Sequence, residues 1–203
     1  MVNHSREDIN VMTLEKHVID TMKEWQIKIG SFDSNIRLYY PKISLCRCLN
    51  LSIDIDNEKL SGYIERYFAE QIKYLGNVTV SANQDRFCIM VGKEGCDYVE
   101  KKIPEPEFLV KFLEILKSQK LQDILDYFRE YAIQQETCVC VEKEEGGLET
   151  VLYFTDEHVE PYVYCIDENE FGITYHRFTK KDYVDLKCPD NTAGAGKLAT
   201  EVN

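Results

Sequence analysis

The first half of the chain is dominated by apolar residues that recur every three or four positions, the period of a helix with one buried face. The first stretch begins at Ser5, which has capping-box spacing to Asp8, and ends at Gly30. Segment 93–103 fits no single period. The pattern predicts helices over residues 5–30, 56–76, 106–116 and 121–132.

Strand patterns interrupt these helices. The run 86–91, RFCIMV, has no helical spacing and is closed by a glycine, which predicts a strand buried on both faces and central to the core. We expect it to form a hairpin with 77–81 through the polar loop 82–85. Residues 36–40 alternate like a strand until a proline follows, and 43–51 fit either a strand or a helix.

From residue 137 onward the apolar period changes to two, which predicts strands. Two strands surround the Glu-Glu-Gly-Gly turn within 138–155, and two more, 162–167 and 171–178, surround the turn 168–170. Four strands in this order indicate an antiparallel sheet with one solvated face. Residues 179–186 fit a short closing helix.

The predicted fold class is therefore α+β, with N-terminal helices and an inserted hairpin packed with a C-terminal antiparallel sheet of about four strands. The chain has 203 residues, of which 44% are hydrophobic, and no Pro-, Gly- or Ser-rich linker interrupts its middle. We expect a single domain over 1–187 and a flexible polar tail over 188–203.

The start of the chain is polar, and no apolar run reaches the length of about 18 residues that a membrane span needs. A cytoplasmic protein is therefore expected, with no membrane partner. The net charge of −12 also disfavours nucleic acid, because the phosphate backbone repels an acidic surface.

The negative charge is concentrated in one segment. Residues 136–170 hold eleven acids and one Lys, whereas the rest of the chain holds 25 acids against 23 Lys and Arg. A sheet face selected only for solubility would mix both signs. We therefore expect this segment to bind a basic protein partner. The candidate partner-binding residues are Glu142, Glu144, Glu145, Glu149, Asp156, Glu157, Glu160, Asp167, Glu168 and Glu170.

The eight cysteines suit a reducing compartment in which thiols stay free. Two Cys-x-Cys pairs, Cys46 with Cys48 and Cys138 with Cys140, could present two thiolates from one strand face to zinc. Both lack the turn glycines of zinc knuckles, and the second pair alternates with valines as in a strand buried on both faces. We interpret them as core residues and expect no metal and no cofactor.

Two other patterns have simpler explanations than a site. Acids within 54–65 match part of a calcium loop, but Lys59 stands where the loop needs glycine, and a helix N-cap at Asp56 explains the same residues. Cys165 and His158 are the nearest candidate nucleophile and base, yet the acidic surroundings would raise the pKa of the thiol. No catalytic residue is assigned, and we interpret the dense aromatic residues of the late sheet as packing.

The run RFCIMVGKEGCDYVEKKI, followed by two helices and a sheet, resembles an uncharacterised domain family of anaerobic gut bacteria. The resemblance covers Asp56 to Leu186 and implies a bacterial protein, but it carries no motif with assigned chemistry and implies no activity. In being acidic, cytoplasmic and α+β, the chain is also similar in type to immunity proteins that neutralise a toxin.

These observations favour a non-enzymatic binding module that presents an acidic sheet surface to a basic protein partner. The alternative is a small hydrolase or transferase whose site assembles from residues distant in sequence. The oligomeric state is left open.

Overall fold

The computed structural model describes residues 13–30, 34–143 and 149–187. It divides into two compact units, residues 1–117 and 118–203. Each unit contains one antiparallel sheet together with helices, so the predicted α+β class is confirmed. The expected single domain stays a prediction, and the expected tail over 188–203 lies outside the described residues.

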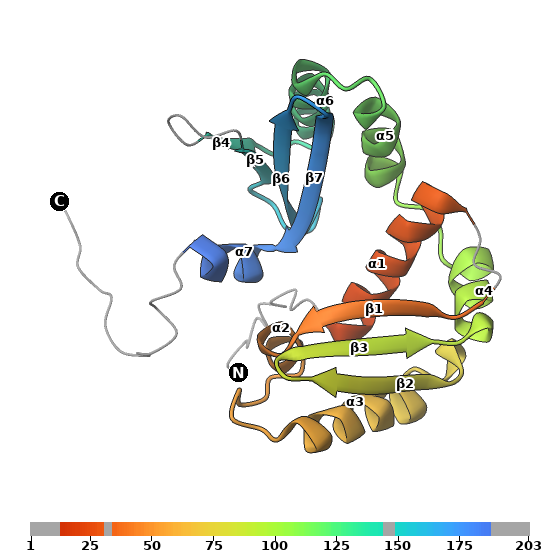
Figure 1. The fold of residues 1–203 in the computed structure, drawn as a ribbon. Coiled ribbons are helices and arrows are strands. Elements are labelled where there is room, and N and C mark those ends of the chain that lie inside the picture. The colour runs from red at the N-terminus through yellow and green to blue at the C-terminus, as the bar shows by residue number, and fades with distance from the viewer. Residues whose placement is uncertain (1–12, 31–33, 144–148, 188–203) are drawn as a thin grey trace, which may run out of the picture. The chain divides into compact units, whose positions relative to one another are not determined.

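The first unit contains a three-stranded sheet and most of the helices (Figure 1). Its elements are α1 (Leu14–Ile29), β1 (Ile36–Pro41), α2 (Lys42–Cys48), α3 (Asn57–Gln71), the 3-10 helix η1 (Lys73–Leu75), β2 (Val78–Asn83), β3 (Arg86–Val91), α4 (Lys93–Lys102) and α5 (Glu107–Leu116). Segments 43–51 and 93–103, which the sequence left open, are mainly the helices α2 and α4.

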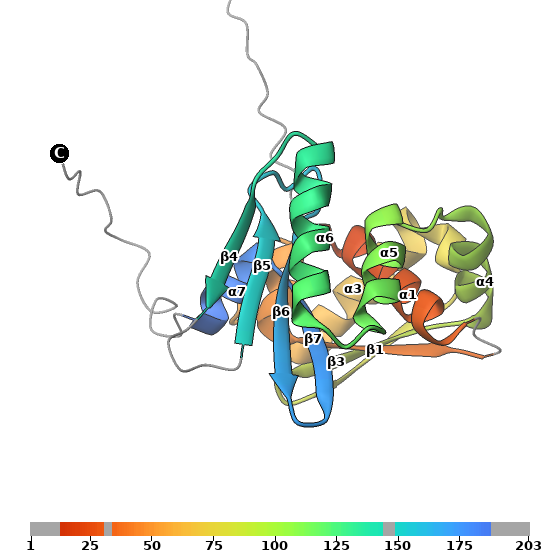
Figure 2. The same cartoon turned by 90° about the horizontal axis from the view of Figure 1, so that it is seen from above.

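Strand β3 is the centre of the first sheet, whose order is β1-β3-β2. Phe87, Ile89 and Val91 are buried in one core with residues of α1, α3 and α4. The prediction that this strand is buried on both faces is wrong, because Cys88 and Met90 on its other face are only half-buried. Figure 2 shows the reason: α1, α3 and α4 lie on the same side of the strands.

Local backbone signals set the ends of these elements. The first described helix begins at Leu14, where the Thr13 hydroxyl accepts from the Lys16 N–H, while the predicted capping box at Ser5 lies outside the described residues. Asp56 caps α3 as predicted, but α3 ends five residues before the glycine that the pattern marked, because η1 intervenes. The hairpin is confirmed, with its turn shortened to Gln84 and Asp85.

Two long polar side chains of α1 are buried against α4. Lys23 is only 3% exposed, and its Nζ donates to the Glu100 carbonyl at 3.2 Å. Gln26 donates from Nε2 to the Cys96 carbonyl at 3.0 Å. The ammonium lies where the last turn of α4 leaves its carbonyls without helical partners and the helix dipole is negative. These bonds fix α1 on α4 by polar contacts as well as by apolar packing.

The second unit is a four-stranded meander with two helices. Its strand order, β4-β5-β6-β7, is the predicted one. Its elements are α6 (Leu121–Gln134), β4 (Val139–Lys143), β5 (Glu149–Phe154), β6 (Tyr162–Asn169), β7 (Gly172–Thr179) and α7 (Lys180–Lys187).

Both faces of the middle of this sheet are covered. On one face Phe128 of α6 stacks on Phe154, with ring centroids 5.3 Å apart, and meets Tyr164 edge-on at 5.4 Å. On the other face Tyr183 of α7 joins a cluster that includes Cys165. The expected solvated face is therefore wrong for β6, where five consecutive residues, 162–166, are buried.

Candidate functional site

Four of the ten predicted acidic residues gather at one end of the second sheet. Glu149, the first residue of β5, lies opposite Asp167 near the end of β6. Glu168 follows in the last part of β6 and Glu170 lies in the β6–β7 turn, and both are exposed. The antiparallel register therefore brings acids from two separate parts of the sequence to the same end of the sheet.

Within this group Glu149 and Asp167 share one face of the sheet, because residues directly opposite in an antiparallel pair point the same way. Both are half-buried. Like charges opposite each other destabilise a strand pair. Their placement here is therefore not explained by the stability of the sheet.

The most exposed large apolar side chain of the described residues lies beside these acids. Phe171, in the β6–β7 turn, is 91% exposed. The turn is held on both sides: the Asn169 side-chain oxygen accepts from the Phe171 N–H at 2.9 Å, and the Gln119 side-chain oxygen accepts from the Ile173 N–H. Gly172 has φ 124°, which favours glycine. We call Glu149, Asp167, Glu168, Glu170 and Phe171 the acidic tip.

Glu142 lies elsewhere, on the face of β4 toward α7, and its carboxylate is already engaged. Tyr153 donates to its Oε1 at 2.8 Å, and Tyr183 of α7 donates to its Oε2 at 3.3 Å. The hydrogen bond to Glu142, together with burial, raises the pKa of Tyr153. This carboxylate links β4, β5 and α7, which is a structural role.

Three further acids lie at the opposite end of the sheet. The Asp156 side chain accepts from the His158 N–H at 2.8 Å, and Glu157 forms an ion pair with Lys180 at 3.4 Å. Glu160 is buried and accepts from the Tyr164 hydroxyl at 3.2 Å. The last two predicted residues, Glu144 and Glu145, lie outside the described residues.

The structure places the two Cys-x-Cys pairs in different kinds of element. Cys46 and Cys48 lie on the helix α2, where i and i+2 do not share a face. Cys140 lies on β4, an edge strand that is not buried on both faces, and Cys138 precedes it and is exposed. Within 13–30, 34–143 and 149–187 no group of three or more His, Cys, Asp or Glu is arranged to hold a metal ion.

The candidate nucleophile Cys165 has a different histidine beside it from the one considered in the sequence. It is buried in β6, and the register places the exposed His176 of β7 opposite it, whereas His158 is an exposed residue of the β5–β6 connection. A buried thiol in the middle of a sheet covered on both faces is not accessible to a substrate. The geometry of this pair does not favour catalysis.

Sequence reasoning missed Phe171: the pattern predicts it as the first residue of a strand, whereas it lies in the β6–β7 turn. Three of the six aromatic residues of the late sheet are buried, which agrees with their interpretation as packing: Tyr162, Tyr164 and Phe154. The other three, Tyr153, Tyr175 and Phe178, are half-buried. The available signal was position: Phe171 stands between Asp-Glu-Asn-Glu and a glycine, where a strand turns and packing partners are scarce.

Fold and site together define a small α+β protein with two antiparallel sheets and an acidic, aromatic-tipped hairpin. The chain belongs to a family described as "Domain of unknown function, E. rectale Gene description (DUF3877)", whose model matches residues 11–187. This confirms the resemblance to an uncharacterised family named for a gut anaerobe. The searches of curated proteins and of solved structures found no match. Among the described residues no helix is long and apolar enough to cross a membrane.

Proposed function

We propose that this protein is a non-enzymatic binding module whose acidic tip engages a basic surface of a protein partner. The observation that carries the proposal is Phe171, an aromatic side chain 91% exposed in a hydrogen-bonded turn and flanked by acids. Exposed aromatic residues in a rigid setting are typical of the anchors that dominate binding energy.

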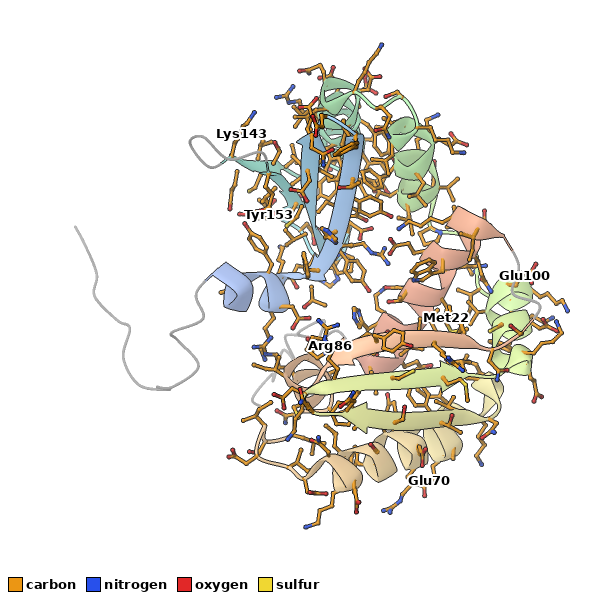
Figure 3. All side chains as sticks on the ribbon, in the orientation of Figure 1. Met22, Glu70, Arg86, Glu100, Lys143 and Tyr153 are labelled. Carbon is orange, nitrogen blue, oxygen red and sulfur yellow. The ribbon has the colours of Figure 1, made fainter. Side chains whose placement is uncertain are left out.

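The acids around Phe171 supply the second component of such a surface. Lys143 is the single Lys or Arg within residues 136–170 (Figure 3), so this segment carries a large excess of negative charge. Complementary charge accelerates encounter with a basic partner and selects against acidic ones. The tip thus combines long-range attraction with a short-range apolar anchor, as an immunity-type protein would require.

Order in the turn favours binding further. The bonds from Asn169 and Gln119 hold the backbone on both sides of Phe171 before any partner arrives. A preorganised loop loses less conformational entropy on association. The alternative, a small hydrolase or transferase, has less support, because the thiol of the one Cys–His juxtaposition noted above is buried.

The test uses the partner recovered from the native host with the full chain as bait, and then measures association and dissociation rates with variants. Glu168→Lys/Glu170→Lys should slow association at least tenfold at low salt, and the difference should shrink at high salt as screening grows. Phe171→Ser should act mainly by accelerating dissociation.

The matched control is Asp123→Lys/Glu130→Lys on α6, which makes the same charge change at two exposed positions of the same unit. If the control and the tip charge reversals slowed association equally, the effect would come from the net charge of the protein and not from the position of the acidic tip. Unchanged kinetics in both tip variants would refute the proposal.

A further inference from the structure

A second surface lies on the first unit, on the side of the sheet that none of the unit's described helices covers (Figure 2). Alternation along the three strands directs one set of side chains to this side, in three cross-strand rows. The rows are Arg37, Met90 and Thr79; Tyr39, Cys88 and Ser81; and Pro41, Arg86 and Asn83. We call these nine residues the open face.

The charge of the open face is opposite to that of the acidic tip. Its strand positions carry two arginines and no acid, and among the described residues that line the depression over these strands the one acid is Asp85 in the hairpin turn. Neither Arg37 nor Arg86 forms an ion pair with a described carboxylate. Arg86 lies at the start of β3, beside the hairpin turn (Figure 3). Two guanidinium groups are therefore available to an anionic ligand.

The open face is hollowed, and around the edge strand β1 it adjoins α1, which packs on the other side of the sheet. One depression of about 860 Å³ lies over the strands, and a second of about 590 Å³ is lined by Trp25 and Ile29. Arg37 and Met90 line both depressions. Trp25, Ile29 and Tyr39 are 46%, 62% and 66% exposed. A continuous surface thus places an arginine between two exposed aromatic side chains.

We propose that the open face, with Trp25 and Ile29, binds an extended acidic peptide segment of another protein that carries a large apolar side chain. Trp, Tyr and Arg are the residues enriched in binding hot spots, and Met adapts to varied apolar shapes. The depressions lie open along the sheet, which suits an extended segment better than an enclosed small molecule. Single-stranded nucleic acid fits less well, because two arginines on a chain of net charge −12 make a weak track for phosphates.

This proposal concerns a different unit from the proposed function and a ligand of opposite charge. A single peptide selection can therefore test the two proposals separately. A phage-displayed library of random dodecapeptides is selected on the full chain. Acidic peptides with Phe, Leu or Trp should be enriched, and their synthetic versions should bind Arg37→Glu and Tyr39→Ala at least tenfold more weakly. Arg66→Glu is the matched control, an exposed arginine on α3, and it should leave their affinity unchanged.

Each outcome decides one of the two proposals. Basic peptides that lose affinity with Phe171→Ser support the acidic tip alone. The open-face proposal is overturned if no acidic peptide is enriched, or if the acidic peptides bind Arg37→Glu as tightly as the wild type. It is also overturned if a fluorescent single-stranded oligonucleotide binds the wild type more tightly than the acidic peptides do and loses affinity for Arg37→Glu. Far-ultraviolet circular dichroism of each variant verifies that loss of binding does not reflect unfolding.

Discussion

Gly95 in α4 gives the sharpest test of the packing in the first unit. A methyl group at this position would overlap the Leu75 carbonyl oxygen of η1 and come within 2.6 Å of Val91 Cγ1. Glycine is therefore what allows α4 to approach η1 and β3 so closely. Gly62 in α3 is the natural comparison, because an added Cβ there meets nothing within 4 Å.

From helix propensity alone, a Gly→Ala substitution inside a helix raises the free energy of unfolding by about 0.5–1 kcal/mol. Gly62→Ala should show this gain. In Gly95→Ala the same gain is opposed by overpacking, which typically costs about 1–3 kcal/mol, and here part of the obstruction is backbone that cannot rotate away. We expect a net loss of about 1–2 kcal/mol, and thus opposite signs for the same chemical change at two helix positions.

Denaturant unfolding followed by the fluorescence of Trp25, the single tryptophan of the chain, reports on the first unit, where α1 carries it. For a chain of this length a change of 1 kcal/mol shifts the melting temperature by about 2–4 °C, so thermal scans would resolve both variants. Gly95→Ala as stable as the wild type, or more stable, would show that α4 does not contact η1 as described.

Three further predictions test other parts of the structure. Ile89→Ala, at a fully buried position of the central strand, should lower the free energy of unfolding by about 2–5 kcal/mol in the same denaturant assay, and a loss below about 1 kcal/mol would contradict its central place. In thiol titration of the native protein with Ellman's reagent, Cys138→Ser should remove a fast-reacting thiol and Cys96→Ser should not. The reason is that Cys138 is exposed, whereas burial raises the pKa of Cys96. Equal reactivity of the two thiols in the native protein would argue against the burial of Cys96. Burial and the hydrogen bond to Glu15 raise the pKa of Tyr74. The free energy of unfolding of the wild type should therefore exceed that of Tyr74→Phe by its full amount at neutral pH, and this difference should decline above pH of about 10. A difference independent of pH would contradict this assignment.

The sequence predicted most of the elements because hydrophobic period and end signals are local properties. Asp56, Gly30 and the apolar run of β3 each mark an element without knowledge of the rest of the chain. Burial is a different kind of property. Cys88 and Met90 read as core residues, and only the placement of the helices on one side of the sheet shows that they are half-exposed.

The candidate site was predictable in charge but not in place. Counting acids identified the segment 136–170, yet the register decides which acids meet: Glu149 and Asp167, eighteen residues apart, become neighbours, whereas Glu160 is buried beside Tyr164. Side-chain engagement is likewise a tertiary property. Nothing in the local sequence of Glu142 indicates that two tyrosine hydroxyls donate to its carboxylate.

The burial of Lys23 has a chemical consequence. Amine-directed acylating reagents need an accessible amine, and this ammonium is enclosed between α1 and the end of α4 while it donates to the Glu100 carbonyl. Exposed lysines such as Lys73 and Lys111 would be acylated in the native protein, whereas Lys23 would react only when α1 and α4 separate. The rate at which Lys23 is covalently labelled, measured by peptide mass spectrometry, would therefore report how often α1 and α4 separate in the first unit.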